Sequence, residues 1–217
     1  MDIEKSRFNM VEQQIRPWDV LDAKVLELLF KVKREDFVPA VYQSLAFVDM
    51  EIPLGHGEKM WPPRLEARAL QALQVQPHER VLEVGTGSGY FTALLAAQAA
   101  AVVTVEIHAD LSEEAARKFH AHGLSRVQTR AGDAARDWEG DGQFDVIVFT
   151  GSLPLIPESY LKRLNPGGRL FAVVGEAPAM TAQRVTCVST GTYRHEDLFE
   201  TVTASLSHAE QPERFVF

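Results

Sequence analysis

The residues best suited to chemistry form a glycine-rich run at positions 83–90, with the sequence EVGTGSGY. The run lies where a strand predicted over 81–84 turns into a helix predicted from Tyr90. Glycines at such a turn let the backbone approach a ligand closely, and the helix that follows presents free N–H groups. The dinucleotide spacing G-x-G-x-x-G is absent, because Tyr90 stands where the third glycine would be. The remaining G-x-G-x-G arrangement is typical of S-adenosylmethionine sites.

Acidic residues follow the next two predicted strands. Glu106 ends the second strand about 20 residues after the loop, where a carboxylate can bind both ribose hydroxyls of an adenosine ligand. Gly132 and Asp133 end the third strand, and Asp133 suits the adenine amino group. Taken alone, each acid has a structural alternative, because such residues also cap helices and Glu83 can orient backbone amides without touching a ligand. Together they favour a cofactor site, because the carboxyl ends of parallel strands meet at one sheet edge.

The predicted cofactor site therefore combines the loop, the two acidic strand ends and their neighbours. Its members are Glu83, Gly85, Thr86, Gly87, Ser88, Gly89, Glu106, Ile107, Gly132, Asp133 and Ala134. We predict no metal site, because His120 and His122 lie two apart on a predicted helix and so face different directions. The single cysteine, Cys187, excludes a cysteine cage.

These motifs require a sheet that brings several strand ends together. After Pro77, short runs of β-forming residues alternate with helical patterns, which favours βαβ units on a parallel sheet. We predict an α/β fold, Rossmann-like, with a mostly parallel sheet and helices on both faces. The strands are expected over 81–84, 102–106, 127–130, 144–149 and 169–174, with helices near 90–98, 110–122 and 157–164. Two more strands, over 184–189 and 198–206, are expected to form a C-terminal antiparallel hairpin.

The first part of the chain has a different pattern. Apolar residues recur at helical spacing, with Phe8, Val11 and Ile15 on one face and positions 25, 26, 29 and 30 on another, and Asp22 is placed to cap the second helix. Residues 52–57 read as an extended segment that enters a glycine-rich turn, and a helix is expected over 64–73. We predict a single domain over 1–217, in which 1–76 is a helical preface and substrate-side lid and 77–217 the cofactor-binding core.

Composition narrows the function classes. The chain has 217 residues with 22 Lys and Arg against 30 Asp and Glu, a formal net charge of -8 that disfavours nucleic-acid binding. The longest apolar stretch, 91–105, is too short and too interrupted for a membrane span. The charged N-terminus lacks a secretory signal pattern, and the single cysteine fits a reducing compartment, so we expect a cytoplasmic protein and favour a monomer.

Several motifs resemble the protein-L-isoaspartate O-methyltransferase family. They are MVEQQIR at 10–16, FVP at 37–39, IPLGHG at 52–57, VLEVGTGSGY at 81–90 and LNPGGRL at 164–170. The resemblance implies a class I methyltransferase fold, S-adenosylmethionine as cofactor, and carboxyl methylation of isoaspartyl residues during repair of damaged proteins. The implied partner is an isoaspartyl protein or peptide.

Two departures lie on the substrate side. After Gly-His-Gly the family usually runs Gln-Thr-Ile-Ser-Gln-Pro, with hydroxyls beside the cofactor and the isoaspartyl carboxylate. Here 58–63 reads EKMWPP, so Lys59 replaces the threonine and Trp61 the serine. The family also carries a C-terminal strand resembling Arg-Phe-Val-Pro-Leu that helps to hold the peptide. This chain has FETVTASL at 199–206, and its tail ends RFVF at 214–217.

The candidate catalytic residues are Lys59, Trp61 and His56. An acceptor carboxylate is already ionised at neutral pH and needs capture rather than a general base. The Lys59 ammonium can supply a charge-assisted hydrogen bond, or Lys59 can simply be a solvated side chain. Trp61 can face the sulfonium through its ring, plug the peptide groove, or simply pack in the core. His56 is either a general base or a support for its loop.

Three functions are consistent with these residues. They are isoaspartyl methylation, methylation of another acceptor such as a small molecule with the same fold and cofactor, and cofactor binding with weak or no catalysis. The loss of the family's hydroxyls predicts that isoaspartyl repair is weak or absent even with cofactor bound.

Overall fold

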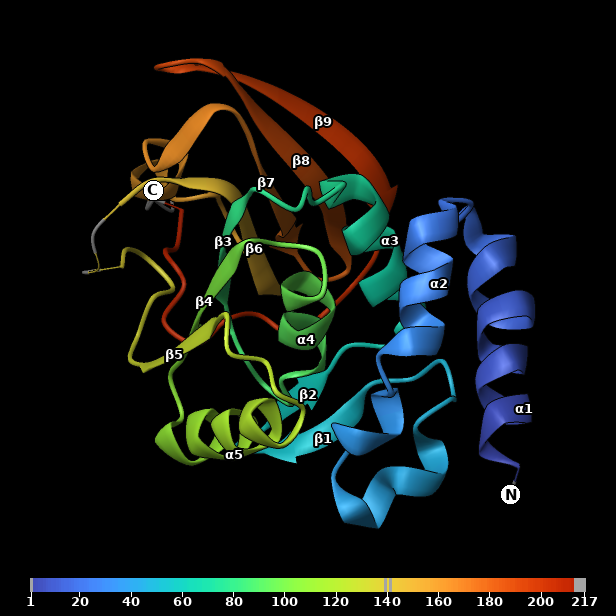
Figure 1. The fold of residues 1–217 in the computed structure, drawn as a ribbon. Helices are drawn as coiled ribbons and strands as arrows, with labels where there is room; N and C mark the ends of the chain where they lie inside the picture. Colours follow the sequence, from blue (N-terminus) through green and yellow to red (C-terminus); the bar gives the residue numbers. More distant parts are fainter. Residues whose placement is uncertain (1, 139, 141, 213–217) are drawn as a thin grey trace.

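A seven-stranded sheet forms the centre of the computed structural model, which describes residues 2–138, 140 and 142–212 (Figure 1). The strand order is β5-β4-β3-β6-β7-β8-β9. Pairing is parallel from β5 to β7, with Val84 opposite Val105, and antiparallel from β7 to β9. The strands span Arg80–Val84 (β3), Ala101–Glu106 (β4), Val127–Ala131 (β5), Phe144–Leu153 (β6), Leu164–Glu176 (β7), Ala179–Ser189 (β8) and Thr192–Glu200 (β9). The predicted fold class, with its C-terminal antiparallel hairpin, is confirmed.

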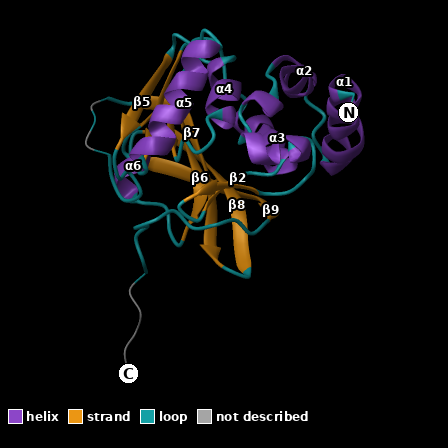
Figure 2. Cartoon of the chain, turned by 90° about the horizontal axis from the view of Figure 1, so that it is seen from below, coloured by secondary structure: helices purple, strands orange, loops and turns teal. Residues whose placement is uncertain are grey.

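Helices cover both faces of the sheet, so the central strands are apolar on both sides. In β3, Val81 packs in the core cluster that contains Leu94 and Phe119, whereas its neighbour Leu82 packs in the opposite cluster with Tyr160. Figure 2 shows α3, α4 and α5 together on one side and α6 on the other. These helices span Pro63–Leu73 (α3), Tyr90–Ala96 (α4), Ala109–Ala121 (α5) and Glu158–Leu161 (α6).

The N-terminal helices stack against α3. They are α1 (Ile3–Asn9), the π-helical η1 (Met10–Ile15) and α2 (Ala23–Lys31), joined by the short turn η2 (Arg16–Trp18) and followed by η3 (Arg34–Asp36) and η4 (Ala40–Leu45). Asp22 caps α2 as predicted, accepting a hydrogen bond from the Lys24 amide at 2.8 Å. Val11 and Ile15 are fully buried, but Phe8 is 53% exposed and its ring contacts Phe30 on the outer side of the helices.

Several predicted boundaries were wrong: β7 begins at Leu164 rather than 169 and β9 at Thr192 rather than 198, and two element ends differ because of long-range pairing. The last strand was expected to reach 206, but β9 ends at Glu200 and the chain crosses to β6, where the Ser152 amide donates to the Ala204 carbonyl at 2.8 Å. The helix expected over 157–164 ends at Leu161, because Leu164 already pairs with Phe144 in the sheet. Neither of these long-range contacts can be predicted from local secondary-structure propensity.

A short hairpin extends from the helical region to the carboxyl ends of the parallel strands. Its strands, β1 (Ile52–Gly55) and β2 (Glu58–Met60), are antiparallel and are joined through His56 and Gly57, which both have positive φ. The extended segment predicted before the glycine turn is thus confirmed as β1. The hairpin, rather than α1 or α2, lines the pocket described below.

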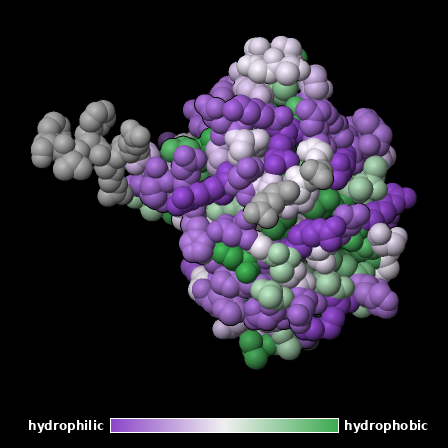
Figure 3. Space-filling view, turned by 90° about the vertical axis from the view of Figure 1, so that its left-hand side faces the viewer, coloured by the Kyte–Doolittle hydropathy of each residue, from purple (hydrophilic) through white to green (hydrophobic). Residues whose placement is uncertain are grey.

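The surface agrees with the acidic composition. In Figure 3 hydrophilic residues dominate the visible face, and hydrophobic ones are scattered among them. No helix within the described ranges has the length and apolar character needed to cross a bilayer. Cys187 is buried and unpaired. The C-terminal RFVF motif lies outside the described residues.

Candidate active site

The glycine loop joins β3 to α4 and forms the floor of the site. Gly85 has φ of 99°, and a Cβ atom added there would collide with the hydroxyl of Thr150. That hydroxyl donates to the Gly85 carbonyl at 2.5 Å, so the end of β6 touches the loop directly. Gly89 has φ of 83°, and its Cβ would lie 2.8 Å from the Phe119 ring of α5. Thr150 and Phe119 therefore already fill the space that a side chain would need at these two positions, so the tight turn requires glycine there.

A pocket lies above this loop, at the carboxyl ends of β3, β4, β5 and β6, where the strand order reverses. The hairpin covers it from one side through Leu54, Glu58 and Lys59, and the C-terminal segment 203–207 covers it from another. Seven of the predicted cofactor residues line it, namely Gly85, Gly87, Glu106, Ile107, Gly132, Asp133 and Ala134. We call it the cofactor pocket.

Glu106 connects the loop to the second strand. Its carboxylate accepts hydrogen bonds from the Gly87 amide at 2.8 Å and the His108 amide at 3.1 Å. The side chain is only 4% exposed, yet it lines the pocket. Each carboxylate oxygen keeps a further lone pair for a ligand, as binding of vicinal hydroxyls requires.

Asp133 occupies the adjoining strand end. One oxygen accepts from the Ala135 amide at 3.0 Å, and the other lies 2.7 Å from Nδ1 of His208. His208 belongs to the segment that crosses the pocket, and its carbonyl accepts from the Arg136 guanidinium at 2.8 Å. Asp133 therefore both lines the pocket and ties the C-terminal segment to the sheet.

Glu83 lies beneath the loop and lines neither this pocket nor its neighbour. One oxygen accepts from the hydroxyls of Thr92 and Thr104, and Thr104 in turn bonds Thr86 at 2.6 Å. The other oxygen has no partner among the described residues. Burial raises the pKa of Glu83 to about 8; the two threonine hydrogen bonds oppose the rise, and the Glu106 carboxylate adds to it. This geometry matches the alternative in which Glu83 supports the loop from below.

A second pocket adjoins the first. Three predicted residues line this pocket and not the cofactor pocket, namely Thr86, Ser88 and Trp61. The two pockets share four lining residues: Lys59, Gly85, Gly87 and Thr150. A ligand in one pocket would therefore meet a ligand in the other across the glycine loop. Gly89 lines neither.

Trp61 forms a fixed wall of the second pocket. The indole is 4% exposed and packs edge-on against Phe91 and Phe171, with ring centroids 5.5 and 6.3 Å away. Its backbone carbonyl accepts from the Arg34 guanidinium at 2.7 Å. Arg34 is itself ion-paired with buried Glu66. Burial raises the pKa of Glu66 to about 7, although Arg34 opposes the rise.

Lys59 lies at the junction of the pockets but is not buried. Its ammonium donates to the Glu51 carboxylate at 2.8 Å, and the side chain is 46% exposed. The hydrogen bond and charge of Glu51 raise the pKa of Lys59 above its ordinary value, so the group stays cationic. An ammonium has three protons, and one bond to Glu51 leaves others for a carboxylate in the pocket.

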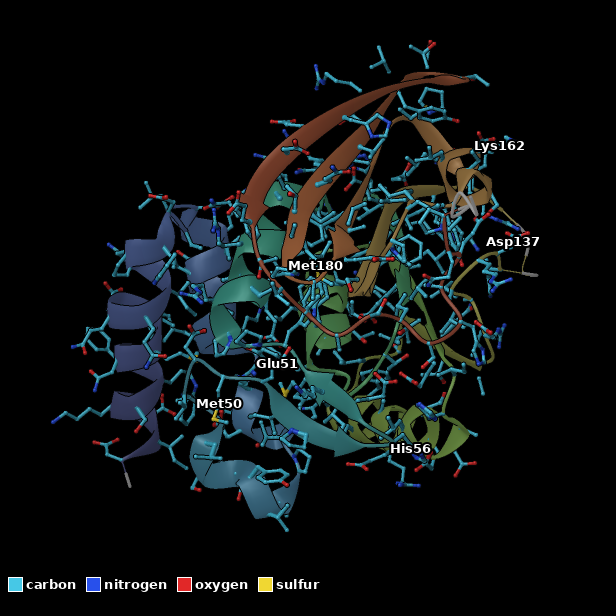
Figure 4. The ribbon with its side chains drawn as sticks, turned by 180° about the vertical axis from the view of Figure 1, so that it is seen from behind. Met50, Glu51, His56, Asp137, Lys162 and Met180 are labelled. Carbon is cyan, nitrogen blue, oxygen red and sulfur yellow. The ribbon has the colours of Figure 1, made fainter. Side chains whose placement is uncertain are left out.

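His56 lies at the hairpin tip, outside both pockets. Figure 4 shows it over α5, at the opposite end of the hairpin from Glu51. Its Nε2 lies 2.8 Å from an Asp110 oxygen, and its ring stacks on His108 at 4.2 Å. The structure thus places His56 where it can hold the hairpin on α5, which corresponds to the supporting role rather than the general base.

Sequence reasoning missed the residues contributed from a distance. Thr150 lies within β6, directly after the strand predicted over 144–149, where no acidic residue marks the site, and Leu54 and Glu58 belong to the hairpin. The segment 203–207 lies far along the chain from the loop. A small or polar residue after the fourth parallel strand is the one signal that could have suggested Thr150, since that strand end adjoins the loop.

Comparisons with known proteins identify the family of the chain. The family model for protein-L-isoaspartate(D-aspartate) O-methyltransferase matches residues 5–210. Protein-L-isoaspartate O-methyltransferase 1 of Rhodopseudomonas palustris (strain HaA2) is 39% identical over 193 residues, 88% of this chain and 79% of the relative. The Petrotoga mobilis (strain DSM 10674 / SJ95) protein-L-isoaspartate O-methyltransferase is 34% identical over 197 residues, 90% of this chain and 92% of its own.

A solved structure shares the fold. It is a Plasmodium falciparum protein assigned as a protein-L-isoaspartate O-methyltransferase, crystallised with S-adenosyl-L-homocysteine. It superposes with a TM-score of 0.80 over 94% of this chain and 98% of its own, at 19% identity. The family model spans nearly the whole chain and the relatives exceed 30% identity over most of their length. The chain belongs to the protein-L-isoaspartate(D-aspartate) O-methyltransferase family.

Proposed function

We propose that this protein transfers a methyl group from S-adenosylmethionine to the side-chain carboxylate of isoaspartyl residues in proteins or peptides. The observation that carries the proposal is the pair of adjoining pockets that share Lys59, Gly85, Gly87 and Thr150. One pocket has the residues for an adenosine ligand, and the other adjoins it at these four shared residues. A buried, unpaired Cys187 supports a reducing, cytoplasmic setting for this activity.

The residues present fit S-adenosylmethionine. Gly85 and Gly87 line the cofactor pocket, so a ligand can lie against the loop backbone there. Glu106 offers carboxylate lone pairs to vicinal hydroxyls, and Asp133 offers an acceptor at the neighbouring strand end. Glu58 adds a third carboxylate to the same pocket, which suits a ligand that carries positive charge.

Bound S-adenosylmethionine supplies an electrophilic methyl group, which an ionised carboxylate accepts without a general base. The chain's own contributions are then alignment and removal of water. The hairpin and segment 203–207 cover the cofactor pocket, and the indole of Trp61 lines the acceptor side. Lys59 holds the incoming carboxylate through a charge-assisted hydrogen bond.

Labelled methyl from S-adenosylmethionine, offered with an isoaspartyl peptide and its aspartyl isomer, tests the proposal. Methyl transfer to the isoaspartyl peptide alone supports it. Transfer to neither peptide contradicts it and favours the second candidate, methylation of a different acceptor. The specific observation behind that candidate is Trp61, a bulky wall where the family usually has a serine. The prediction that repair is weak or absent is tested in the same assay by comparing wild type with a Lys59→Thr, Trp61→Ser double variant.

The role of Lys59 is tested with Lys59→Met. We expect the KM for the isoaspartyl peptide to rise about tenfold or more, since a hydrogen bond between charged groups is lost. Lys162→Met is the matched control, because Lys162 directly follows α6 and is 72% exposed, away from the hairpin (Figure 4). Equal kinetics for the two variants would show that Lys59 does not capture the acceptor.

A further inference from the structure

The hydroxyl group of Thr203 lies in the wall between the two pockets. The indole Nε1 of Trp61 donates a hydrogen bond to Oγ1 of Thr203 at 3.2 Å. Trp61 lines the second pocket and Thr203 lines the cofactor pocket, so this bond spans the wall beside the junction. Both side chains are buried, with 4% and 7% of their surface exposed.

Both partners are held in place independently of each other. The Trp61 carbonyl is bound by Arg34, and its ring is packed between Phe91 and Phe171. The Thr203 carbonyl accepts from the Ser152 hydroxyl at 3.2 Å, and the next residue's carbonyl accepts from the Ser152 amide. Neither side of the Trp61–Thr203 bond can therefore move freely, and the position of Oγ1 is fixed relative to the pocket.

The direction of the Thr203 proton follows from this bond. A hydroxyl has one proton and two lone pairs, and the indole N–H can only donate, so it occupies a lone pair. The Thr203 proton is then left to point elsewhere, and the one side-chain hydrogen bond of Thr203 to the residues that the structure describes is the one accepted from Trp61. A buried hydroxyl that lines a pocket and keeps a free proton is suited to donate to a ligand oxygen.

We propose that the Thr203 hydroxyl donates a hydrogen bond to the acceptor carboxylate, and that Trp61 is the positioning residue that orients it. This inference rests on the proposed function. Trp61 stands where the family has a serine, so the serine hydroxyl is missing from the acceptor site. The indole N–H of Trp61 instead binds the hydroxyl of Thr203 in the C-terminal segment. The carboxylate of an acceptor entering past Trp61 is then held between Lys59, which lines both pockets, and Thr203, which lines the cofactor pocket.

The test uses methyl transfer to an isoaspartyl peptide at saturating S-adenosylmethionine. Thr203→Val keeps the side-chain shape without the hydroxyl, and we expect kcat/KM to fall at least tenfold. Thr203→Ser restores the hydroxyl and should stay within about threefold of wild type. Thr201→Val, on the same segment but outside both pockets, is the matched control. Thermal melting of every variant checks that it is folded at the assay temperature.

Trp61→Phe removes the N–H and keeps an aromatic ring. We expect it to lower kcat/KM several-fold in wild type but to add little in the Thr203→Val background, because Trp61 acts through Thr203. Calorimetry with S-adenosyl-L-homocysteine should give affinities within about twofold of wild type for both single variants. This separates an acceptor role from a cofactor role.

Three results would overturn the inference. They are a Thr203→Val variant with kcat/KM within twofold of wild type, a loss matched by equally weakened S-adenosyl-L-homocysteine binding, or an unchanged Trp61→Phe variant. If Thr203→Val melts below the assay temperature, Trp61→Phe and Thr203→Ser decide the matter. If the wild-type protein methylates no isoaspartyl peptide, both the proposed function and this inference are wrong. If the wild type is active and the variants have the same kcat/KM as wild type, only the role of Thr203 is refuted.

Discussion

Glu83→Gln should remove a pH dependence of stability that arises from one buried carboxyl group. In the folded chain the pKa of Glu83 is raised from its ordinary value of 4.5 to about 8, because the side chain is fully buried beneath the glycine loop. The folded state therefore holds a proton that the unfolded state has released. The resulting stabilisation is fully present below pH 4.5 and is lost as the pH rises through about 8.

The magnitude follows from these two pKa values. Integrating the proton-binding difference from pH 6 to pH 9 gives a loss of about 3 kcal/mol in the free energy of unfolding. A glutamine amide imitates the protonated acid, since its oxygen can accept from Thr92 and Thr104 as Glu83 does. The variant should thus lack this loss. Glu66, also with a raised pKa, titrates in both proteins and cancels in the comparison.

Urea unfolding of wild type and Glu83→Gln without cofactor, at pH 6 and pH 9, measures the effect. We expect the stability difference between the two proteins to shift by about 3 kcal/mol in favour of the variant at pH 9. Glu113→Gln, an exposed change on α5, controls for the lost charge. A difference between wild type and Glu83→Gln that is the same at both pH values would refute the reasoning, because it would mean that Glu83 ionises normally in the folded chain.

Three further changes probe the site. Gly85→Ala should abolish measurable S-adenosyl-L-homocysteine binding by calorimetry, because its Cβ would collide with Thr150 and its φ of 99° is strained; normal affinity would contradict the loop geometry. Glu106→Ala should weaken the same binding at least tenfold, at about 1.5–3 kcal/mol per charged hydrogen bond, and unchanged affinity would reject the ribose assignment. Arg34→Ala should cost about 3–5 kcal/mol in urea unfolding by leaving Glu66 unpaired, which a loss below 1 kcal/mol would disprove.

The cofactor side of this protein could be predicted from the sequence because its signals are local. The spacing of the glycines, and Glu106 at the end of the next strand, are short-range patterns. Parallel pairing then brings the strand ends to one edge, so residues at equivalent positions meet without further information. Asp133 was located by the same reasoning. The roles of Glu83 and His56 were less determined, because a carboxylate or imidazole near a loop can serve either a ligand or the loop itself.

The acceptor side depended on tertiary structure. The Trp61–Thr203 bond joins residues 142 positions apart, and Thr203 reaches the pocket only because the chain leaves β9 and crosses to β6. Comparison of residue types at the hairpin indicated a lost hydroxyl; the fold places a different hydroxyl in the wall beside the junction. Contacts of this kind have no period along the chain, since they arise from how separate elements pack. The sequence therefore determined which cofactor the site suits, and the packing decided which side chains line the proposed acceptor site.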